Sequence, residues 1–195
     1  MSAPEIIAAA DRLLARYGYR RMTVEDIARE ANIGKGSIYL HFPSKEAVIL
    51  AVINRHIEAT LEVLRRLAGG PGPAGERLAE MLVARVLERF DRFLPYRESL
   101  HEMLAAIRPA LLAQRETQLR QEARIFSRVI EELGGPPGAA RMLLAATNSY
   151  LPYYLSAEEL GSRARLRREV SGLAGLLVAG VAAQATAAPV PEEVG

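Results

Sequence analysis

Residues 23 to 45, with the sequence TVEDIAREANIGKGSIYLHFPSK, constrain the fold of this chain more than any other segment. Apolar residues recur at helical spacing in two short runs, which a tight turn separates. Pro43 ends the second run, because the residue before a proline avoids the helical region of backbone space. Ser44 then caps a third helix. The segment therefore predicts a helix, a tight turn, a second helix and the start of a longer one.

The first helix of the pair carries its own start and stop signals. Thr23 and Asp26 can form a capping box, in which each side chain bonds the backbone amide of the other residue. Val24, Ile27, Ala28 and Ala31 then form one apolar stripe. Asn32 tolerates the left-handed conformation that ends a helix.

The second helix, Lys35 to Phe42, has a distinctive outer face. If Ile38 points inward, the helical period brings Phe42 to the same side, while Gly36 and Leu40 point away from the core. A glycine lets the helix backbone approach a surface closely, and a leucine can touch a thymine methyl group in the DNA major groove. This layout is typical of a helix that reads DNA while its back packs on a helical scaffold.

These residues resemble the TetR family of transcriptional regulators. The matching stretch begins with an expected helix from Glu5 to Tyr17, ended by Gly18, and reaches Lys45, about a third of the chain. Its most specific parts are T-V-E-D-I-A-x-x-A, K-G-S-I-Y-L-H-F and P-S-K-E. Two positions depart from the family pattern: Asn32 stands where glycine is usual, and Gly34 stands where serine or threonine is usual. Asparagine suits that turn, and glycine is only a slightly weaker cap.

The resemblance implies a division of labour among the DNA-binding residues. Those expected to face the bases are Lys35, Gly36, Ser37 and Leu40. Those expected to contact phosphates are Tyr39, His41 and Lys45, together with the amide end of the helix that starts at Thr23. Two alternatives stay open: Tyr39 as a half-buried packing aromatic, and His41 as an exposed helix-end residue without a DNA role.

Composition predicts an all-α protein large enough for a sizeable core. The chain has 195 residues, half of them hydrophobic, and Ala, Leu, Arg and Glu fill long stretches. We expect an N-terminal three-helix helix-turn-helix domain over residues 1–45, with the motif itself at about 23–42. Residues 46–195 are expected to form a helical domain for effector binding and dimerisation. The net charge is only +2, but six cations face three anions between Arg16 and Lys45, and this mild local excess suits a specific DNA reader better than a nonspecific coat.

Glycine and proline divide the second domain into expected helices. The expected ranges are 44–67, 74–94, a short helix between Pro95 and Pro109, a helix from Pro109 to 133, then 139–155 and 163–185, followed by a frayed tail. The clearest boundary is the Gly- and Pro-rich run at 69–73.

The last two expected helices are rich in alanine and glycine, which let helix axes approach closely. The resemblance implies a homodimer held through these helices as a four-helix bundle, and tight packing within one chain is the alternative. The apolar stretch from Leu173 to Ala188 contains Gln184 and is short for a membrane span, so a buried oligomer helix explains it better. The first apolar segment is interrupted by Asp11 and Arg12, unlike a signal peptide. We expect a cytoplasmic protein that does not enter membranes.

The resemblance also implies an effector pocket in the middle of the chain. The candidate lining residues are Met81, Phe90, Phe93, Met103, Ile107, Phe126, Asn148, Tyr150, Tyr153 and Tyr154. Aromatic and methionine stripes on helices are more often plain core, so each has that alternative. Asn148 is the most suggestive, because a polar group amid apolar neighbours needs a partner. The few polar candidates favour an apolar or amphipathic effector.

Nothing in the sequence indicates an enzyme. It has no Gly-rich phosphate loop, metal-spaced cluster or nucleophile elbow, and with no cysteine it has neither disulfides nor thiol catalysis. We expect no catalytic residues, cofactor or metal. The prediction is a repressor that binds a palindromic DNA operator and is released by a small effector. The alternatives are an effector-independent DNA-binding regulator, and a helical assembly module whose helix-turn-helix is only structural.

Overall fold

The computed structural model describes residues 2–152 and 161–187, and all regular structure within them is helical. The α-helices are α1 (Ala3–Arg21), α2 (Val24–Glu30), α3 (Lys35–His41), α4 (Lys45–Ala68), α5 (Ala74–Phe93), α6 (Leu100–Glu132), α7 (Ala139–Thr147) and α8 (Arg163–Ala187). Two short 3₁₀ turns, η1 (Leu94–Tyr96) and η2 (Asn148–Tyr150), follow α5 and α7. The prediction of an all-α fold is confirmed.

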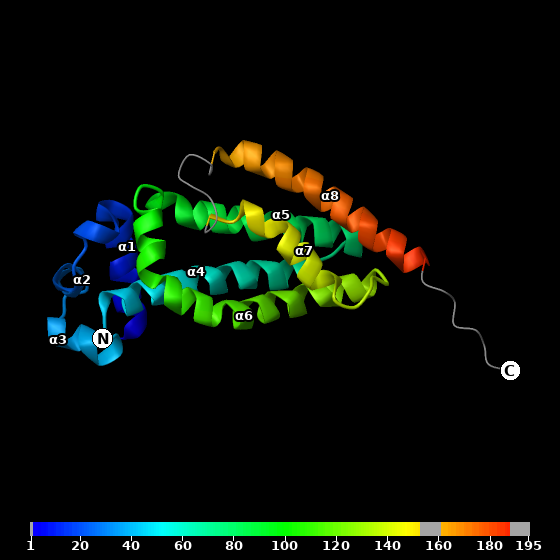
Figure 1. Cartoon of the computed structure of the whole chain (residues 1–195). Helices are drawn as coiled ribbons and strands as arrows, with labels where there is room; N and C mark the ends of the chain where they lie inside the picture. Colours follow the sequence, from blue (N-terminus) through cyan, green and yellow to red (C-terminus); the bar gives the residue numbers. More distant parts are fainter. Residues whose placement is uncertain (1, 153–160, 188–195) are drawn as a thin grey trace.

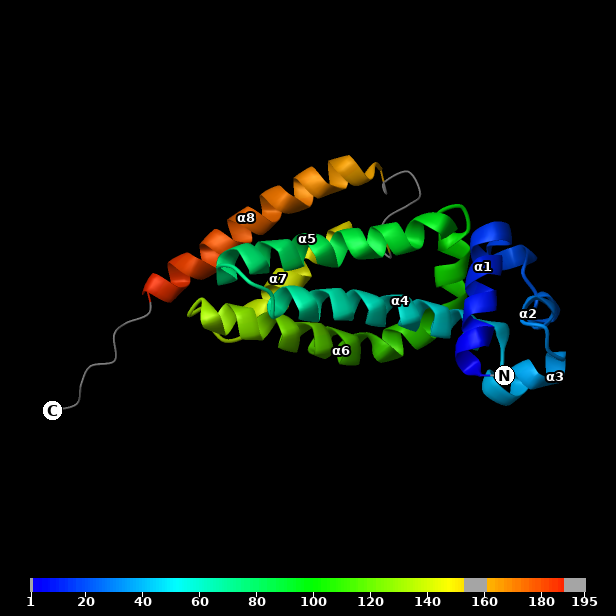
Figure 2. The same cartoon turned by 180° about the vertical axis from the view of Figure 1, so that it is seen from behind.

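The molecule is elongated, with α1, α2 and α3 gathered at one end (Figures 1 and 2). The long helices α4, α5 and α6 form the body and pack on one another. Helix α7 crosses beside α5 and α6, and α8 lies along the outer side of α5. One continuous apolar core runs from α1 through the body to α8.

The predicted helix ends at the motif are present in the structure. Thr23 Oγ1 accepts a hydrogen bond from the Asp26 amide at 3.1 Å, and Asp26 Oδ2 accepts one from the Thr23 amide at 3.0 Å. These bonds satisfy amides at the start of α2 that have no partner inside the helix. Asn32 has a φ of 54°, the left-handed turn expected between α2 and α3. Local sequence therefore sets the geometry of the motif.

Gly18 interrupts α1 as predicted, although α1 resumes for one more turn. Its φ of 74° and ψ of 169° suit only glycine, and a Cβ placed there would lie 3.1 Å from Ser99 Cβ. The residue therefore allows both the bend in α1 and its close approach to the start of α6.

Helix α4 connects the end of the molecule that holds the motif to the body. Ser44 caps it by accepting a hydrogen bond from the Ala47 amide at 3.2 Å. A stripe of apolar side chains along its length is buried, from Val48 near the motif to Leu64 in the body. This helix packs on α1, α5 and α6, so a tilt of α4 moves its contacts at both ends.

The expected break at Pro109 is wrong: α6 runs without interruption from Leu100 to Glu132 with Pro109 inside it. The proline costs the helix one hydrogen bond and about 3 kcal/mol in a typical interior. Pro109 and Ala105, whose carbonyl loses its partner, are both exposed, so water can solvate that carbonyl. Burial of Met103 and Ile107 on the opposite face stabilises the turns around it.

The end of the predicted 139–155 helix is also wrong, because α7 ends at Thr147 and gives way to η2. The last helix was expected over 163–185 and α8 extends to Ala187, while the rest of the expected tail, from 188, lies outside the described residues. Helix α8 buries only one stripe, Leu166, Val170, Ala174 and Val181, against its neighbours. Most of the rest of α8 is exposed or only half-buried.

Candidate functional site

Helix α3 exposes most of its surface at one end of the molecule. Ile38 is fully buried and anchors the helix, whereas Leu40 is 86% exposed and Tyr39 is 47% exposed. A Cβ added at Gly36 would meet no atom within 4 Å. Ser37 is exposed beside them. A large apolar side chain left this open is unusual, and here it stands next to polar groups and a bare backbone.

The cation at the start of α3 is held in place by α2. Lys35 forms an ion pair with Glu25, and its Nζ lies 5.9 Å from the centre of the Tyr39 ring. The hydrogen bond to Glu25 raises the pKa of Lys35, so it remains a cation. Both side chains of the pair are about half exposed, so a phosphate could displace Glu25 at little cost.

Lys45 is more enclosed than the sequence suggests. Its Nζ donates to the carbonyls of Tyr19 at 2.9 Å and Met22 at 3.1 Å, and lies 4.0 Å from the Tyr19 ring centre. An ammonium group has three N–H donors, so one remains for a phosphate. Lys45 therefore joins α4 to the end of α1, and its predicted phosphate contact stays a prediction.

The remaining predicted DNA contacts lie at the edges of this surface. His41 is exposed at the last residue of α3. Thr23 is exposed at the start of α2, where its hydroxyl is occupied by the capping box. The structure thus brings together Lys35, Gly36, Ser37, Tyr39, Leu40 and His41 on α3, with Thr23 and Lys45 at the ends of the neighbouring helices.

A polar cluster joins α1 to the body of the molecule. The Asp11 carboxylate accepts a hydrogen bond from the Tyr96 hydroxyl and forms an ion pair with Arg55. His56 Nε2 lies 2.8 Å from the Tyr96 hydroxyl and 3.4 Å from Asp11 Oδ1. Burial acts to raise the pKa of Asp11, but the bonds from His56 and Tyr96 outweigh it and lower that pKa. Sequence patterns gave no sign of this cluster.

The segment from Tyr96 to Glu102 touches α1 three times. Besides the bond between Tyr96 and Asp11, Ser99 packs on Gly18, and Glu102 pairs with Arg20 at 2.9 Å. The residues between these contacts face the other way and line a cavity; they are Arg97, Glu98, Leu100 and His101. This segment therefore lies between α1 and the cavity.

The cavity has a volume of about 620 Å³ and lies among α4, α5, α6 and the end of α7. Its apolar lining residues are Ile57, Leu100, Leu104, Ala105, Leu111, Leu112, Leu119 and Leu151. Its polar lining residues are Arg85, Arg89, Arg97, Glu98, His101, Arg108, Arg115, Gln118, Glu122 and Asn148. The volume is within the range of small-molecule sites.

Of the predicted effector residues, Asn148 alone is among the residues that line this cavity. Six others are buried in the core: Met81, Phe90, Phe93, Met103, Ile107 and Phe126. Tyr150 is half-buried on η2 and is not part of the lining, and Tyr153 and Tyr154 lie outside the described residues. The buried aromatic and methionine residues therefore pack between the helices, which agrees with the alternative that they are plain core. The lining leucines and arginines were missed.

Two buried arginines share one carboxylate at the wall of the cavity. Arg85, Arg89 and Glu122 are each at most 4% exposed. Arg85 donates to Glu122 at 3.2 and 3.3 Å, and Arg89 donates to it at 2.6 Å. Although burial acts to raise the pKa of Glu122, the charges of Arg89 and Arg85 keep it below its usual value. Arg85 also bonds Thr147, the Leu144 carbonyl and Asn148.

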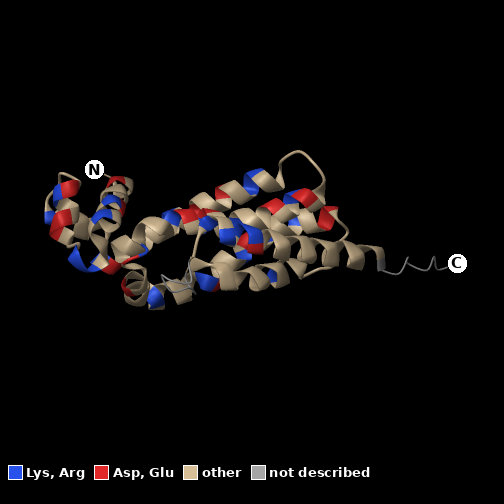
Figure 3. Ribbon diagram, turned by 90° about the horizontal axis from the view of Figure 1, so that it is seen from above, with Lys and Arg blue, Asp and Glu red and all other residues tan. Residues whose placement is uncertain are grey.

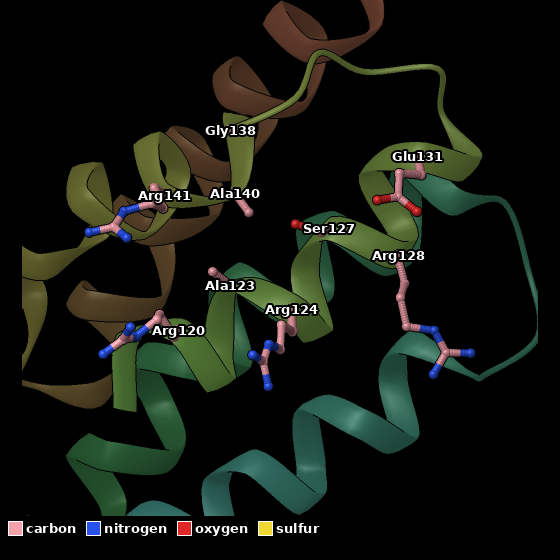
Figure 4. A pocket seen from close by; sticks show the side chains of 9 residues that line it. All are labelled: Arg120, Ala123, Arg124, Ser127, Arg128, Glu131, Gly138, Ala140 and Arg141. Atoms are coloured by element: carbon pink, nitrogen blue, oxygen red, sulfur yellow. The ribbon is translucent and has the colours of Figure 1, made fainter. Parts of the chain in front are cut away.

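A second hollow of about 390 Å³ lies between α6 and the start of α7 (Figure 4). Arg120, Arg124 and Arg128 follow one another along α6, but their side chains extend in different directions and do not converge. Arg141, on α7, pairs with Glu116 at 3.1 Å. Small side chains border the gap itself, so it does not have the geometry of an anion site. Elsewhere in the described part of the chain, no three His, Asp or Glu side chains gather to hold a metal ion.

Charge is unevenly distributed along α8. Arginines occupy its first turns, whereas the remainder carries no charge (Figure 3). On this apolar part Leu176 is 76% exposed, and a Cβ at Gly172, Gly175 or Gly180 would meet no atom within 4 Å. Met142 on neighbouring α7 is 63% exposed. Helix α8 is long and apolar enough to cross a membrane by length and composition, with 17% of its apolar window buried.

Comparisons with known proteins agree with the geometry of the motif. Residues 6–52 match the family model described as "Bacterial regulatory proteins, tetR family". An uncharacterized HTH-type transcriptional regulator, YuxN of Bacillus subtilis (strain 168), is 33% identical over 118 residues, covering 55% of this chain and 40% of YuxN. EthR of Mycobacterium tuberculosis (strain H37Rv) is 36% identical over 66 residues, covering 34% and 31%. The chain spans less than half the length of these curated relatives.

Solved structures share the fold over nearly the whole chain. A transcriptional regulator from Cytophaga hutchinsonii has a TM-score of 0.68 at 21% identity, covering 90% of this chain and 96% of that one. The motif and the helical body together define a helix-turn-helix protein with a second helical domain. Residues 6–52 are similar to the DNA-binding domain of TetR-family regulators, and the helical body shares the fold of solved regulators.

Proposed function

We propose that this protein is a cytoplasmic transcriptional repressor that binds a palindromic operator as a homodimer and leaves it when a small effector binds. The observation that carries the proposal is the open face of α3. Ile38 fixes the helix on the core, while Leu40, about half of Tyr39 and the bare backbone at Gly36 remain open to solvent. Lys35, Ser37 and His41 complete a surface with the donors and apolar contacts that DNA bases and phosphates require.

The exposed face of α8 supports the homodimer. An apolar helix with one buried stripe leaves large hydrophobic side chains in water, which marks an interaction surface in a protein of this size. Glycines open on that face allow a second helix to approach closely. Two copies packed through α7 and α8 would cover Leu176 and Met142. A dimer would also present two α3 helices to two half-sites about one turn of DNA apart.

Two connections lead from the cavity to α3. Helix α4 begins beside the motif at Lys45 and contributes Ile57 to the cavity lining. The segment from Tyr96 to Glu102 contacts α1 on one face and lines the cavity on the other. An effector that moves either element would shift α1 and α3 together, because both pack with α2 in one small core. Release would then follow from a change in the spacing of the two reading helices.

The test begins with selection of bound sequences from random duplex DNA, followed by affinity measurements on the selected site. We expect an enriched palindrome and an affinity that falls steeply with salt, since phosphate contacts release counterions. Leu40→Ala should weaken binding to the selected site, and the exposed Leu94, away from α3, supplies the matched control. Tyr39→Phe and Tyr17→Phe form a second pair, because the two tyrosines are almost equally exposed.

The outcomes separate the candidate functions. An assembly module with a structural motif would enrich no sequence, and Leu40→Ala would behave like Leu94→Ala. An effector-independent regulator would enrich a palindrome but keep its affinity with every ligand that fills the cavity. Sedimentation tests the dimer: Leu176→Glu should give a monomer, whereas Leu94→Glu should not.

A further inference from the structure

The cavity has a cationic lining as well as an apolar one. Five arginines line it, against two carboxylates, those of Glu98 and Glu122. Glu122 is occupied by Arg85 and Arg89. Every N–H of the Arg85 guanidinium has an acceptor, in Glu122, Thr147, the Leu144 carbonyl and Asn148. Arg85 therefore fastens α5 to α6 and α7, and the selectivity of the cavity must come from other groups.

Arg108 and Arg115 are the arginines best placed to receive a ligand. They are seven residues apart on α6, two helical turns, so they share the face that also presents Leu104 and Leu111 to the cavity. Both side chains are exposed at the rim, and the described residues offer neither of them a carboxylate. A guanidinium group presents five donors and no acceptor. The rim therefore favours a ligand that carries negative charge.

Asn148 adds a donor at the wall. Its Oδ1 accepts from Arg85 Nη2 at 2.8 Å, and this bond fixes the orientation of the amide, because Arg85 has no acceptor to offer. The Nδ2 group has no partner among the described residues and belongs to the cavity lining. Asn148 therefore presents two N–H donors rather than an acceptor, and reinforces the preference for oxygen-rich acceptors.

The apolar side of the cavity indicates the chemistry of the rest of the ligand. Leu100, Leu104, Leu111 and Leu119 line one side along α6, with Ile57 of α4 and Leu151 completing the lining. The leucines of α6 are spread along the helix from Leu100 to Leu119 and form an elongated apolar surface. Such a surface suits an extended hydrocarbon body. A polar or compact ligand would leave this wall unfilled.

We propose that the effector is an amphipathic carboxylate whose head pairs with Arg108 and Arg115 and whose hydrocarbon body lies against the leucines of α6. The inference rests on the proposed function for its regulatory meaning, but the ligand class follows from the cavity alone. An amine of the same length would meet like charges at the rim, and an alcohol would lose the charge-assisted bonds. A fully apolar effector would leave the rim arginines without any gain on binding.

The direct test compares three probes of equal chain length: decanoate and decylamine below their critical micelle concentrations, and decanol below its solubility limit. Calorimetric titration of the purified protein should give the tightest binding for decanoate, weaker binding for decanol and none for decylamine. Arg108→Gln and Arg115→Gln should each weaken decanoate about tenfold, equivalent to about 1.4 kcal/mol, and leave decanol unchanged. Arg124→Gln is the matched control, because Arg124 is an exposed arginine of α6 that does not line this cavity.

A charge reversal protects the test against misfolding. The double variant Arg108→Glu with Arg115→Glu should bind decylamine in preference to decanoate, a gain that an unfolded protein cannot show. Asn148→Asp keeps an acceptor for Arg85 but replaces the amide donor with negative charge, so it should also weaken decanoate. Equal affinity for decanoate and decanol, or unchanged decanoate binding in both glutamine variants, would overturn the ligand class.

Operator affinity separates this inference from the proposed function. Decanoate binding as predicted, together with weaker operator binding, supports both. Decanoate binding as predicted, with no change in operator affinity, supports the ligand class and contradicts release by the effector. Operator binding that responds to decylamine but not to decanoate contradicts the ligand class and leaves the regulatory proposal intact.

Discussion

The Tyr96 hydroxyl is the group whose removal best tests how α1 is joined to the body. Tyr96→Phe deletes one oxygen, which donates to the Asp11 carboxylate and lies 2.8 Å from His56 Nε2. The ring itself would remain, edge-on to Phe93 with centroids 6.1 Å apart. The variant therefore removes a polar contact without opening a cavity.

The size of the effect follows from the partners that remain. Hydrogen bonds to charged groups typically contribute about 1.5–3 kcal/mol, and Asp11 would keep Arg55 and His56. We therefore expect the lower part of that range, a loss of about 1.5–2 kcal/mol in the free energy of unfolding. Tyr150→Phe is the matched control, because Tyr150 is half-buried and its hydroxyl has no hydrogen-bond partner among the described residues.

The loss should also depend on pH. The folded protein lowers the pKa of Asp11 below its ordinary value of 3.8, so the charged carboxylate stabilises the fold above that pH. This stabilisation is lost as the pH falls through the lowered value in the folded state. Without the Tyr96 hydroxyl the folded-state pKa should rise toward 3.8. The free energies of unfolding of the parent and the variant should therefore differ most at neutral pH and approach each other in acid.

Urea denaturation at pH 7 and at pH 3, followed by circular dichroism, measures both quantities. The reasoning fails if Tyr96→Phe unfolds at the same urea concentration as Tyr150→Phe. It also fails if the difference between parent and variant is as large at pH 3 as at pH 7, since Asp11 would then contribute no pH dependence.

Three further substitutions test other contacts. Gly36→Ala should raise stability by about 0.5 kcal/mol in urea denaturation, because glycine is a poor helix residue. It should also weaken operator binding, because the added Cβ would face the DNA in the proposed complex; improved or unchanged affinity would refute that placement of α3. Gly18→Ala should lower the free energy of unfolding by about 1–3 kcal/mol in the same assay, because of the positive φ at this position and the nearby Ser99 Cβ. An unchanged free energy would contradict the bend in α1 at Gly18. Glu122→Gln should cost about 3–5 kcal/mol of folding free energy, measured as a lower melting temperature, because two buried arginines lose their carboxylate. A small effect would show that water reaches the two guanidinium groups.

The motif could be predicted from sequence because its determinants are local. The capping box at Thr23, the left-handed Asn32 and the cap at Ser44 each depend on residues within three positions. Ile38 could be placed inside and Leu40 outside by helical period alone. Local signals of this kind act before any tertiary packing and survive it.

The course of α6 could not be predicted, because tertiary burial outweighed a local signal. Pro109 is a strong helix breaker, and dividing the sequence there separated Leu104 and Arg108 from Leu111 and Arg115. Read as one helix, these residues share a face that alternates leucine with arginine. That alternation was the available signal for the cavity, and the expected break concealed it.

The cavity and the polar clusters depend on partners that are distant in sequence. Arg85 meets Glu122 and Asn148 across 37 and 63 positions, and Tyr96 meets Asp11 across 85. No periodicity relates such residues. The aromatic and methionine residues were the natural candidates for a pocket, but they are buried in the core. Leucines and arginines line the cavity instead.

The energies of these contacts indicate where control over DNA binding can reside. A hundredfold loss of operator affinity requires an effector to bind the DNA-free geometry about 2.7 kcal/mol more tightly than the DNA-bound one. Arg108 and Arg115 are each expected to contribute a factor of ten to ligand affinity, which together gives a free energy of that size. It can act on DNA binding only if the ligand cannot reach these two arginines in the DNA-bound geometry. Arg108 follows the segment from Tyr96 to Glu102 by less than two helical turns, so drawing α6 toward a carboxylate would act on the Tyr96–Asp11 contact. That contact, at about 1.5–2 kcal/mol, supplies more than half of the required coupling, but only if it breaks or forms in the transition between the two geometries.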